Sequence, residues 1–585
     1  MSGDKRQNRS ELTNTLNTIQ RFRFGAFEID FDCRELRKHG HRLRVQKKPF
    51  QILQRLLETP GVLVTRSELA RYLWPDLNVL FDRSLNTAVN ALRRVLNDPP
   101  RNPRFIETRS GVGYRFIAPV ENVVEEATAT DDCVSLAVLP FENAAGDASV
   151  DYIADGLAES VLTMLASCAG VRVIARSSAW RFRGPGVEPL EAAKRLRVGA
   201  LITGRILDHG EHLVIGVELV DVQSGQRLWG EQFHRKPSEI LDAAQDIAAE
   251  VCKALGLASP KDTRPVRIQN FDAYQDYWKG RYFYNKMTEE DLHKSVAYFE
   301  AALAVEPECS LAYTGLADTF SLFAMMGTLP SKVALLRAKE YALAAIRSDG
   351  RLAEGHVSLA QVKKLYDWDG AAAEAEYKHA LELNPNSARA RRLYADFLSA
   401  IGRPQEARQQ LRLALELDPM SLVIKMEAAW QLYMARDFQG ALEQSWRALA
   451  MEPKFAPAQQ TLGLAYEQMG MFEEAIVELR NARTCSGDHP VALAALAHAH
   501  AVAGQRQQAR ELLAELQRVS RARYVSSYWV ALVQTGLGEH ALALESLEKA
   551  LEERDVWLIW LKVEPRFDPL RVCPQFGALL QGCEL

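Results

Sequence analysis

The segment DRSLNTAVNALRRVL, residues 82–96, carries side chains that can bind both the bases and the phosphates of a nucleic acid. At 100° per residue, a helix through this segment places Leu85, Val89 and Leu92 on one apolar face. Asparagine, threonine and arginine side chains share the opposite arc, and acids stand only at its ends. The surface of an ordinary soluble helix mixes charges of both signs, so this arc indicates a polyanionic partner.

The arc divides by residue type and angle into two groups. Asn86, Asn90 and Arg93 are the predicted base-reading residues, because asparagine can form two hydrogen bonds with adenine and arginine two with guanine. The residues farther round the arc are better placed for phosphates: Arg83, Thr87 and Arg94.

A second polar group lies in RFIETRSGVGYRFIAPV, residues 104–120, which reads as two short strands joined by a turn. Thr108, Arg109 and Ser110 offer a cation, hydroxyls and turn amides to a nucleic-acid backbone. Gly111 and Gly113 are expected to permit a tight turn there.

The distribution of charge agrees with a nucleic-acid partner for the N-terminal part alone. Residues 1–120 contain 22 Lys and Arg against 12 Asp and Glu, whereas the remaining 465 residues contain 49 against 63. A basic N-terminal part followed by an acidic remainder predicts that the N-terminal part binds a polyanion. At 585 residues the chain is too long for one core, so several domains are expected.

The elements that must position these side chains form a unit of about 100 residues. Short alternating segments over 21–45 predict small strands, and 48–59 has the period of a helix. Thr65 and Glu68 have capping-box spacing ahead of a helix that stops at Pro75. With the 82–97 helix and the final hairpin, residues 21–119 predict one small α+β domain.

Four further segments are predicted. Residues 1–20 resemble a disordered leader, and 120–132 an acidic linker. Strands and helices alternate over 133–258, which indicates a small α/β domain. Over 270–585, Pro385, Pro419 and Pro453 follow one another at intervals of 34 residues, and small residues recur seven apart between them, as at Ala407 and Ala414. This period predicts seven to nine pairs of antiparallel helices, capped by the apolar C-terminal segment.

The first domain resembles the winged helix-turn-helix domain of the OmpR/PhoB type. The likeness rests on RFGAFEID (23–30), LWP (73–75), the 82–96 helix and the 104–120 hairpin. It implies that the helix enters the major groove of double-stranded promoter DNA, that the hairpin lies along the backbone or minor groove, and that loop 75–82 contacts RNA polymerase. Where the family often has another arginine, this helix has Asn90 and Ala91. The DNA sequence that family members recognise therefore cannot be assigned to this chain. The predicted DNA-binding set is Arg83, Ser84, Asn86, Thr87, Asn90, Arg93, Arg94, Thr108, Arg109 and Ser110.

The other zones carry resemblances of their own. LAVLPFEN (136–143) and QRLWGEQF (226–233) are similar to the α/β module of HilA-like and CadC-like regulators, which is also found beside adenylate cyclases and in TolB-like proteins. LGLAYEQMGMFEEAIVEL (462–479) resembles a tetratricopeptide repeat. The repeats are expected to bind a protein partner or a second copy of the chain.

No catalytic constellation accompanies these motifs. The sequence lacks GxxxxGK[ST], HExxH and GxSxG, and it has no Cys/His group at zinc spacing. His498 and His500 diverge on a helix, and Asp155 with Glu159 is expected to be a solvated or cap-side pair and not a metal site. No cofactor, no metal and no enzyme activity are therefore predicted.

The sequence is thus interpreted as a cytoplasmic bacterial transcription regulator, expected to be an activator. No run of about 18 apolar residues suits a membrane span, and the scattered cysteines are expected to be reduced thiols. No receiver domain precedes the winged helix, so control by aspartyl phosphorylation within the chain is not expected. Two alternatives remain open: a repeat scaffold without sequence-specific DNA binding, and a protein associated with a nucleotide cyclase.

Overall fold

The computed structural model of the chain describes residues 21–122, 133–257 and 270–583, apart from short gaps. The gaps are 26, 31–34, 39–40, 44, 46, 59, 74–81, 97, 100–102, 110–111, 145–147, 169, 185, 209, 211 and 522. The predicted leader, most of the linker and nearly all of loop 75–82 lie outside the described residues. The chain divides into two units, Met1–Asp132 and Cys133–Leu585.

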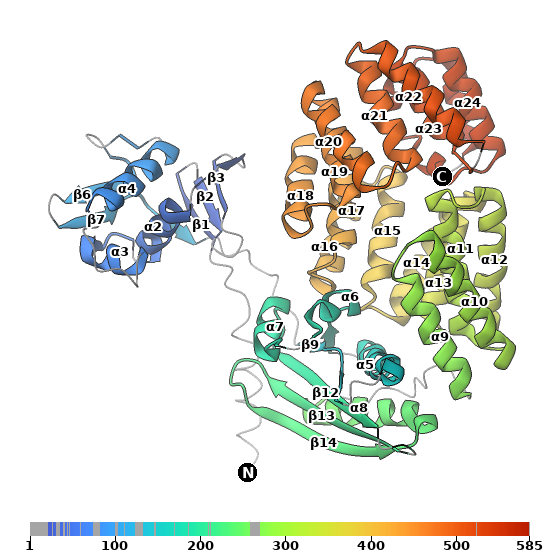
Figure 1. Cartoon of the computed structure of the whole chain (residues 1–585), viewed down its shortest axis with the longest axis horizontal. Helices are drawn as coiled ribbons and strands as arrows, with labels where there is room; N and C mark the ends of the chain where they lie inside the picture. The colour runs from blue at the N-terminus through green and yellow to red at the C-terminus, as the bar shows by residue number, and fades with distance from the viewer. Residues whose placement is uncertain are drawn as a thin grey trace. The chain divides into compact units, whose positions relative to one another are not determined.

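Within its described residues, the first unit has two antiparallel sheets and three helices (Figure 1). One sheet has the order β4-β3-β2-β1-β8, and the other the order β5-β7-β6. Strand β8 pairs with β1, so this sheet takes in residues beyond the expected domain end at 119. The strands are β1 (Arg21–Phe24), β2 (Phe27–Asp30), β3 (Glu35–Lys38), β4 (His41–Leu43), β5 (Leu63–Thr65), β6 (Ile106–Arg109), β7 (Gly113–Phe116) and β8 (Glu121–Asn122). The helices are α2 (Lys47–Glu58), α3 (Arg66–Leu73) and α4 (Asp82–Leu96).

The core of this unit confirms the predicted apolar faces. Leu85, Val89 and Leu92 of α4 are buried, and the ring of Phe24 lies 5.0 Å from that of Phe116 between ring centres. The predicted capping box is also present before α3. The Thr65 amide donates to Glu68 Oε2 at 2.8 Å, and the Glu68 amide donates to Thr65 Oγ1 at 3.2 Å. The start of α3 is therefore fixed by local hydrogen bonds.

The second unit begins with an α/β layer domain whose sheet has the order β11-β9-β12-β13-β14. Strand β9 runs parallel to β11 and β12, whereas β12, β13 and β14 are antiparallel. Leu136 and Val138 face the core with α5 and α8, while Ala137 and Leu139 face the core with α7. The elements are β9 (Val134–Val138), β10 (Glu142–Asn143), α5 (Ala148–Ala166), β11 (Val171–Val173), α6 (Arg176–Ala179), α7 (Pro189–Leu196), β12 (Ala200–Asp208), β13 (Leu213–Asp221), β14 (Arg227–Arg235) and α8 (Ile240–Ala254).

Eight pairs of helices follow within the described part of the chain (Figure 1). The small residues of the 34-residue period, such as Ala407 and Ala414, are buried where the two helices of a pair approach closely. The pairs are α9 (Phe271–Tyr284) and α10 (Glu289–Val305), α11 (Ser310–Met326) and α12 (Ser331–Ser348), α13 (Ala353–Val362) and α14 (Gly370–Leu383), α15 (Ala388–Ala400) and α16 (Pro404–Leu417), α17 (Leu422–Met434) and α18 (Phe438–Met451), α19 (Ala456–Gln468) and α20 (Phe472–Cys485), α21 (Pro490–Val502) and α22 (Arg506–Val519), and α23 (Ser527–Gly536) and α24 (His540–Glu552).

The C-terminal segment does more than cap the last repeat. It comprises η4 (Val556–Trp560), η5 (Pro565–Leu570) and α25 (Pro574–Gly582). Trp557 packs on Trp529 of α23, as a cap would, but Trp560 packs on Trp430 of α17 with 5.6 Å between ring centres. Arg554, just before η4, stacks over Trp368 at 4.3 Å from the ring centre. The segment and Arg554 therefore tie the last repeat to the third and fifth helix pairs.

The α/β domain and the repeats form one unit, because residues next to two of the repeat prolines contact the α/β domain. Asn386 Nδ2 donates to the carbonyl oxygens of Ala166 and Val171 at 2.8 and 2.9 Å. Ser178 Oγ donates to Asp418 Oδ1 at 2.5 Å. No helix among the described residues is both long and apolar enough to cross a bilayer.

Candidate nucleic-acid interface

Helix α4 presents part of the predicted polar arc to solvent. Asn86, Asn90 and Arg94 are exposed. The side chains of Arg83, Ser84 and Thr87 lie outside what the structure describes, as does Ser110 entirely, so their assignment to DNA stays a prediction. The structure therefore brings two amides and one cation together on this face of α4.

Arg93 differs from the prediction. It is only 7% exposed, and its Nη2 donates to the Ile106 carbonyl at 2.6 Å and to Thr108 Oγ1 at 2.7 Å. A guanidinium used in this way is not presented to a guanine edge. Arg93 lies at the border of the apolar face, beside Leu92, and its long side chain reaches strand β6 instead of the polar arc.

Asp98, which the sequence reading did not single out, holds the start of β6. Its carboxylate accepts hydrogen bonds from the backbone amides of Arg104, Phe105 and Ile106 at 2.6, 3.1 and 2.9 Å. Arg93 Nε lies 4.0 Å from the same carboxylate. An aspartate just after a helix and before two prolines is typical of such a turn, so the signal was present in the sequence.

Asn86 is held by two residues that the sequence reading also missed. Arg66 Nη2 donates to Asn86 Oδ1 at 2.9 Å, and the Tyr114 hydroxyl donates to the same oxygen at 2.9 Å. Arg66 Nη1 donates in turn to the Tyr114 hydroxyl at 3.1 Å. These contacts join α3, α4 and β7 beneath the exposed face of α4.

Strands β6 and β7 form the wing. Arg109 is exposed, with its Nε 3.3 Å from Glu107 Oε1, and Thr108 is exposed although its hydroxyl accepts from Arg93. The predicted reason for Gly113 needs correction. A Cβ atom at Gly113 would lie 2.1 Å from the Val64 carbonyl oxygen, so glycine is required by the close approach of β5.

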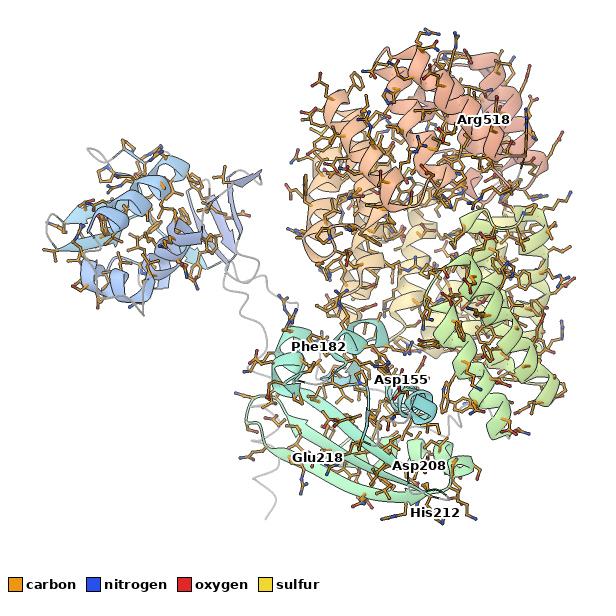
Figure 2. All side chains as sticks on the ribbon, in the orientation of Figure 1. Asp155, Phe182, Asp208, His212, Glu218 and Arg518 are labelled. Atoms are coloured by element: carbon orange, nitrogen blue, oxygen red, sulfur yellow. The ribbon has the colours of Figure 1, made fainter. Side chains whose placement is uncertain are left out.

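The other candidate sites are occupied by ordinary side-chain pairs. Asp155, labelled on α5 in Figure 2, is bonded by Arg183, and Glu159 lies 3.2 Å from Arg176 Nε. His498 bonds Glu467 at 3.0 Å. Among the described residues, no group of three or more His, Cys, Asp or Glu side chains could hold a metal ion.

Comparison with known proteins assigns the separate domains. Residues 40–116 match the family described as transcriptional regulatory protein, C terminal, and residues 131–250 match the second domain of HilA/YgeH-like transcriptional regulators. Residues 367–429 and 456–482 match tetratricopeptide repeats. The transcriptional regulator HilA of Salmonella typhimurium is 26% identical over 426 residues, which are 71% of this chain and 73% of HilA. The chain is a DNA-binding transcription regulator that is similar to HilA.

Two other relatives resemble parts of this chain. The sensory transduction protein BceR of Halalkalibacterium halodurans is 36% identical over 86 residues, 15% of this chain and 37% of BceR. A putative adenylate cyclase of Rhizobium meliloti is 27% identical over 250 residues, 42% of each chain. The family models that match this chain are those of transcriptional regulator domains and tetratricopeptide repeats. The likeness of the α/β domain to TolB-like proteins stays a prediction.

Proposed function

We propose that this HilA-like regulator reads promoter DNA in the bacterial cytoplasm with α4 in the major groove and the β6–β7 wing beside it. The observation that carries the proposal is the exposed face of α4, where Asn86, Asn90 and Arg94 stand together without an acid among them. Amides recognise base edges, and a guanidinium recognises phosphates. Arg83, Ser84, Thr87 and Ser110 belong to the same proposed surface.

In this proposal α4 and the wing form one rigid DNA-binding surface. Arg93 positions the wing through Thr108 and the Ile106 carbonyl, and does not itself read a base. Asp98 holds the beginning of β6 through three backbone amides. A surface that is already ordered loses less conformational entropy when it binds, so these contacts favour affinity. Arg109 then reaches the DNA backbone from a fixed wing.

The second unit supplies control without a catalytic step. Its α/β domain contacts two loops of the repeats, and its C-terminal segment packs on distant repeats. A partner that binds any part of this unit therefore binds a single packed body. We propose that this unit binds a protein partner or a second copy of the chain. Two chains joined in this way would place two winged helices on adjacent half-sites and raise their effective concentration. Loop 75–82 is the proposed contact with RNA polymerase, through which the protein activates transcription.

The test is a salt titration of the full chain on a DNA site selected from genomic fragments. Arg94→Ala is compared with Arg518→Ala, since both remove one exposed arginine and Arg518 lies on α22 in the repeats (Figure 2). The proposal expects weaker DNA binding from Arg94→Ala and unchanged binding from Arg518→Ala. Equal affinities of the two variants for the selected site would count against α4 as the reading helix.

A further inference from the structure

We infer that Asn86 meets DNA only as a hydrogen-bond donor, because Arg66 and Tyr114 hold its amide with the oxygen turned inward. The residue is thereby assigned to guanine, whose O6 and N7 both accept, in preference to adenine or thymine, each of which offers one acceptor in the major groove. This inference rests on the proposed function and deepens it by naming the base class that one residue selects.

The orientation of the amide follows from the chemistry of its partners. The guanidinium of Arg66 has donors only, so the Asn86 atom 2.9 Å from Arg66 Nη2 must be the oxygen. The Tyr114 hydroxyl accepts from Arg66 Nη1 and therefore has its own proton free to donate to Asn86. Turning the amide over would place its NH₂ group against the Arg66 guanidinium, which has donors only. The usual ambiguity between the oxygen and nitrogen of an asparagine amide is thus removed.

The oxygen has no capacity left for DNA. A carbonyl oxygen has two lone pairs, and Arg66 and Tyr114 use both. Tyr114 is 3% exposed and lies in the core beside β5, so it cannot move aside when DNA binds. The two hydrogens of the Asn86 Nδ2 group are what the exposed side chain offers to the major groove.

The hydrogen-bonding groups on the base edges determine which base Asn86 prefers. Adenine recognition by asparagine needs an acceptor for the adenine N6 amino group and a donor for N7. Asn86 lacks the acceptor, so its amide can form one hydrogen bond with adenine N7 or with thymine O4 but two with guanine O6 and N7. Asn90 lies one helical turn further along α4, and within the described part of the chain its exposed amide has no protein partner. Asn90 therefore keeps both functions and is the residue suited to adenine.

The experiment selects binding sites for the full chain from a random DNA pool and compares wild type with Asn86→Ala, Asn86→Asp and Tyr114→Phe. Asn86→Ala identifies the base position that depends on residue 86. We expect guanine there in the wild type. Asn86→Asp keeps an acceptor for Arg66 and Tyr114 but replaces both amide donors with a second oxygen, so the preference should move to cytosine, whose N4 amino group donates.

Tyr114→Phe removes one of the two bonds to Oδ1 and keeps the buried ring. It should let adenine compete at the same position, with discrimination falling by about fivefold or more. In the Asn86→Ala background, Tyr114→Phe should have no further effect on base preference, which separates positioning of Asn86 from general damage to the fold. Thermal unfolding of each variant reports on the fold directly.

The outcomes separate this inference from the proposed function. A wild type that selects no sequence would overturn both. A wild type that selects a motif with adenine or thymine at the position dependent on residue 86, or an Asn86→Asp variant that keeps the wild-type preference, would overturn this inference alone.

Discussion

The guanidinium of Arg93 in helix α4 donates to Thr108 Oγ1 in the wing at 2.7 Å, and to the neighbouring Ile106 carbonyl at 2.6 Å. The two parts of the proposed DNA-binding surface are therefore joined by one buried side chain. This relationship changes Arg93 from a predicted base reader into a residue that positions the wing.

Replacing Arg93 with methionine should loosen β6 without removing a contact to DNA. The substitution leaves the buried Ile106 carbonyl without its donor, and a buried polar group that loses its partner costs about 1–3 kcal/mol. Hydrogen exchange of the β6 amides in the full chain measures the effect, with Arg94→Met as the exposed control. Unchanged exchange in Arg93→Met would show that the wing does not depend on this contact.

Arg94→Ala should lower the salt dependence of DNA binding. If its guanidinium neutralises one phosphate, the slope of log affinity against log salt concentration should become less steep by about 0.9. Fluorescence anisotropy of a labelled DNA duplex at several salt concentrations measures that slope. Arg518→Ala should leave it as in the wild type, and an unchanged slope in Arg94→Ala would remove Arg94 from the phosphate contacts.

The buried pair of Glu564 and Arg566 should stabilise the repeats in a pH-dependent way. Arg566 Nε donates to Glu564 Oε1 at 2.9 Å, and the Tyr433 hydroxyl donates to the same oxygen at 3.1 Å. Burial alone would raise the pKa of Glu564, but the Arg566 charge and these hydrogen bonds hold that pKa below its usual range. A lowered folded-state pKa contributes stability that is present above the unfolded pKa of about 4.3 and is lost as pH falls through the folded value.

Glu564→Gln tests this by leaving Arg566 charged and buried without its counter-ion. Removal of one member of a buried pair costs about 3–5 kcal/mol at neutral pH. The variant should also lose the part of the acid sensitivity that Glu564 supplies, whereas the exposed Glu552→Gln control should follow the wild type. Urea unfolding at several pH values, followed by circular dichroism, gives both quantities. Equal stability of Glu564→Gln and wild type at neutral pH would contradict the account.

Gly156→Ala should disturb the packing between the α/β domain and the first repeat. A Cβ atom at Gly156 would lie 2.0 Å from Trp278 Cε2, so the indole must move, and overpacking of this kind costs about 1–3 kcal/mol. Gly577→Ala is the matched control, because nothing lies within 4 Å of a Cβ at that helical glycine. Proteolysis of α9 should be faster in Gly156→Ala alone. The same rate in both variants would mean that the indole adapts without loosening the interface.

Much of the fold could be predicted because its signals are local. The apolar spacing of Leu85, Val89 and Leu92 is a property of one helix, and the 34-residue period needs only neighbouring repeats. The capping box at Thr65 and Glu68 likewise spans four residues. Each of these patterns is complete within a short window of sequence.

The parts that could not be predicted depend on contacts between distant residues. Arg66 and Tyr114 stand 20 and 28 residues from Asn86, and no spacing rule links them. The turn of Arg93 toward β6 could not be predicted, because angular position on a helix does not show where a long side chain points. Trp560 packs on Trp430, which lies 130 residues earlier in the chain. The sequence therefore predicted the C-terminal segment only as a cap on the last repeat.

The central claim is that the exposed amide face of α4 reads DNA sequence. Its most direct test is selection of genomic DNA by the purified full chain, in parallel with Asn90→Ala. The account predicts one enriched motif for the wild type and loss of preference at one position of that motif in Asn90→Ala, with nonspecific binding retained. No enriched motif, or an identical motif from Asn90→Ala, would contradict it.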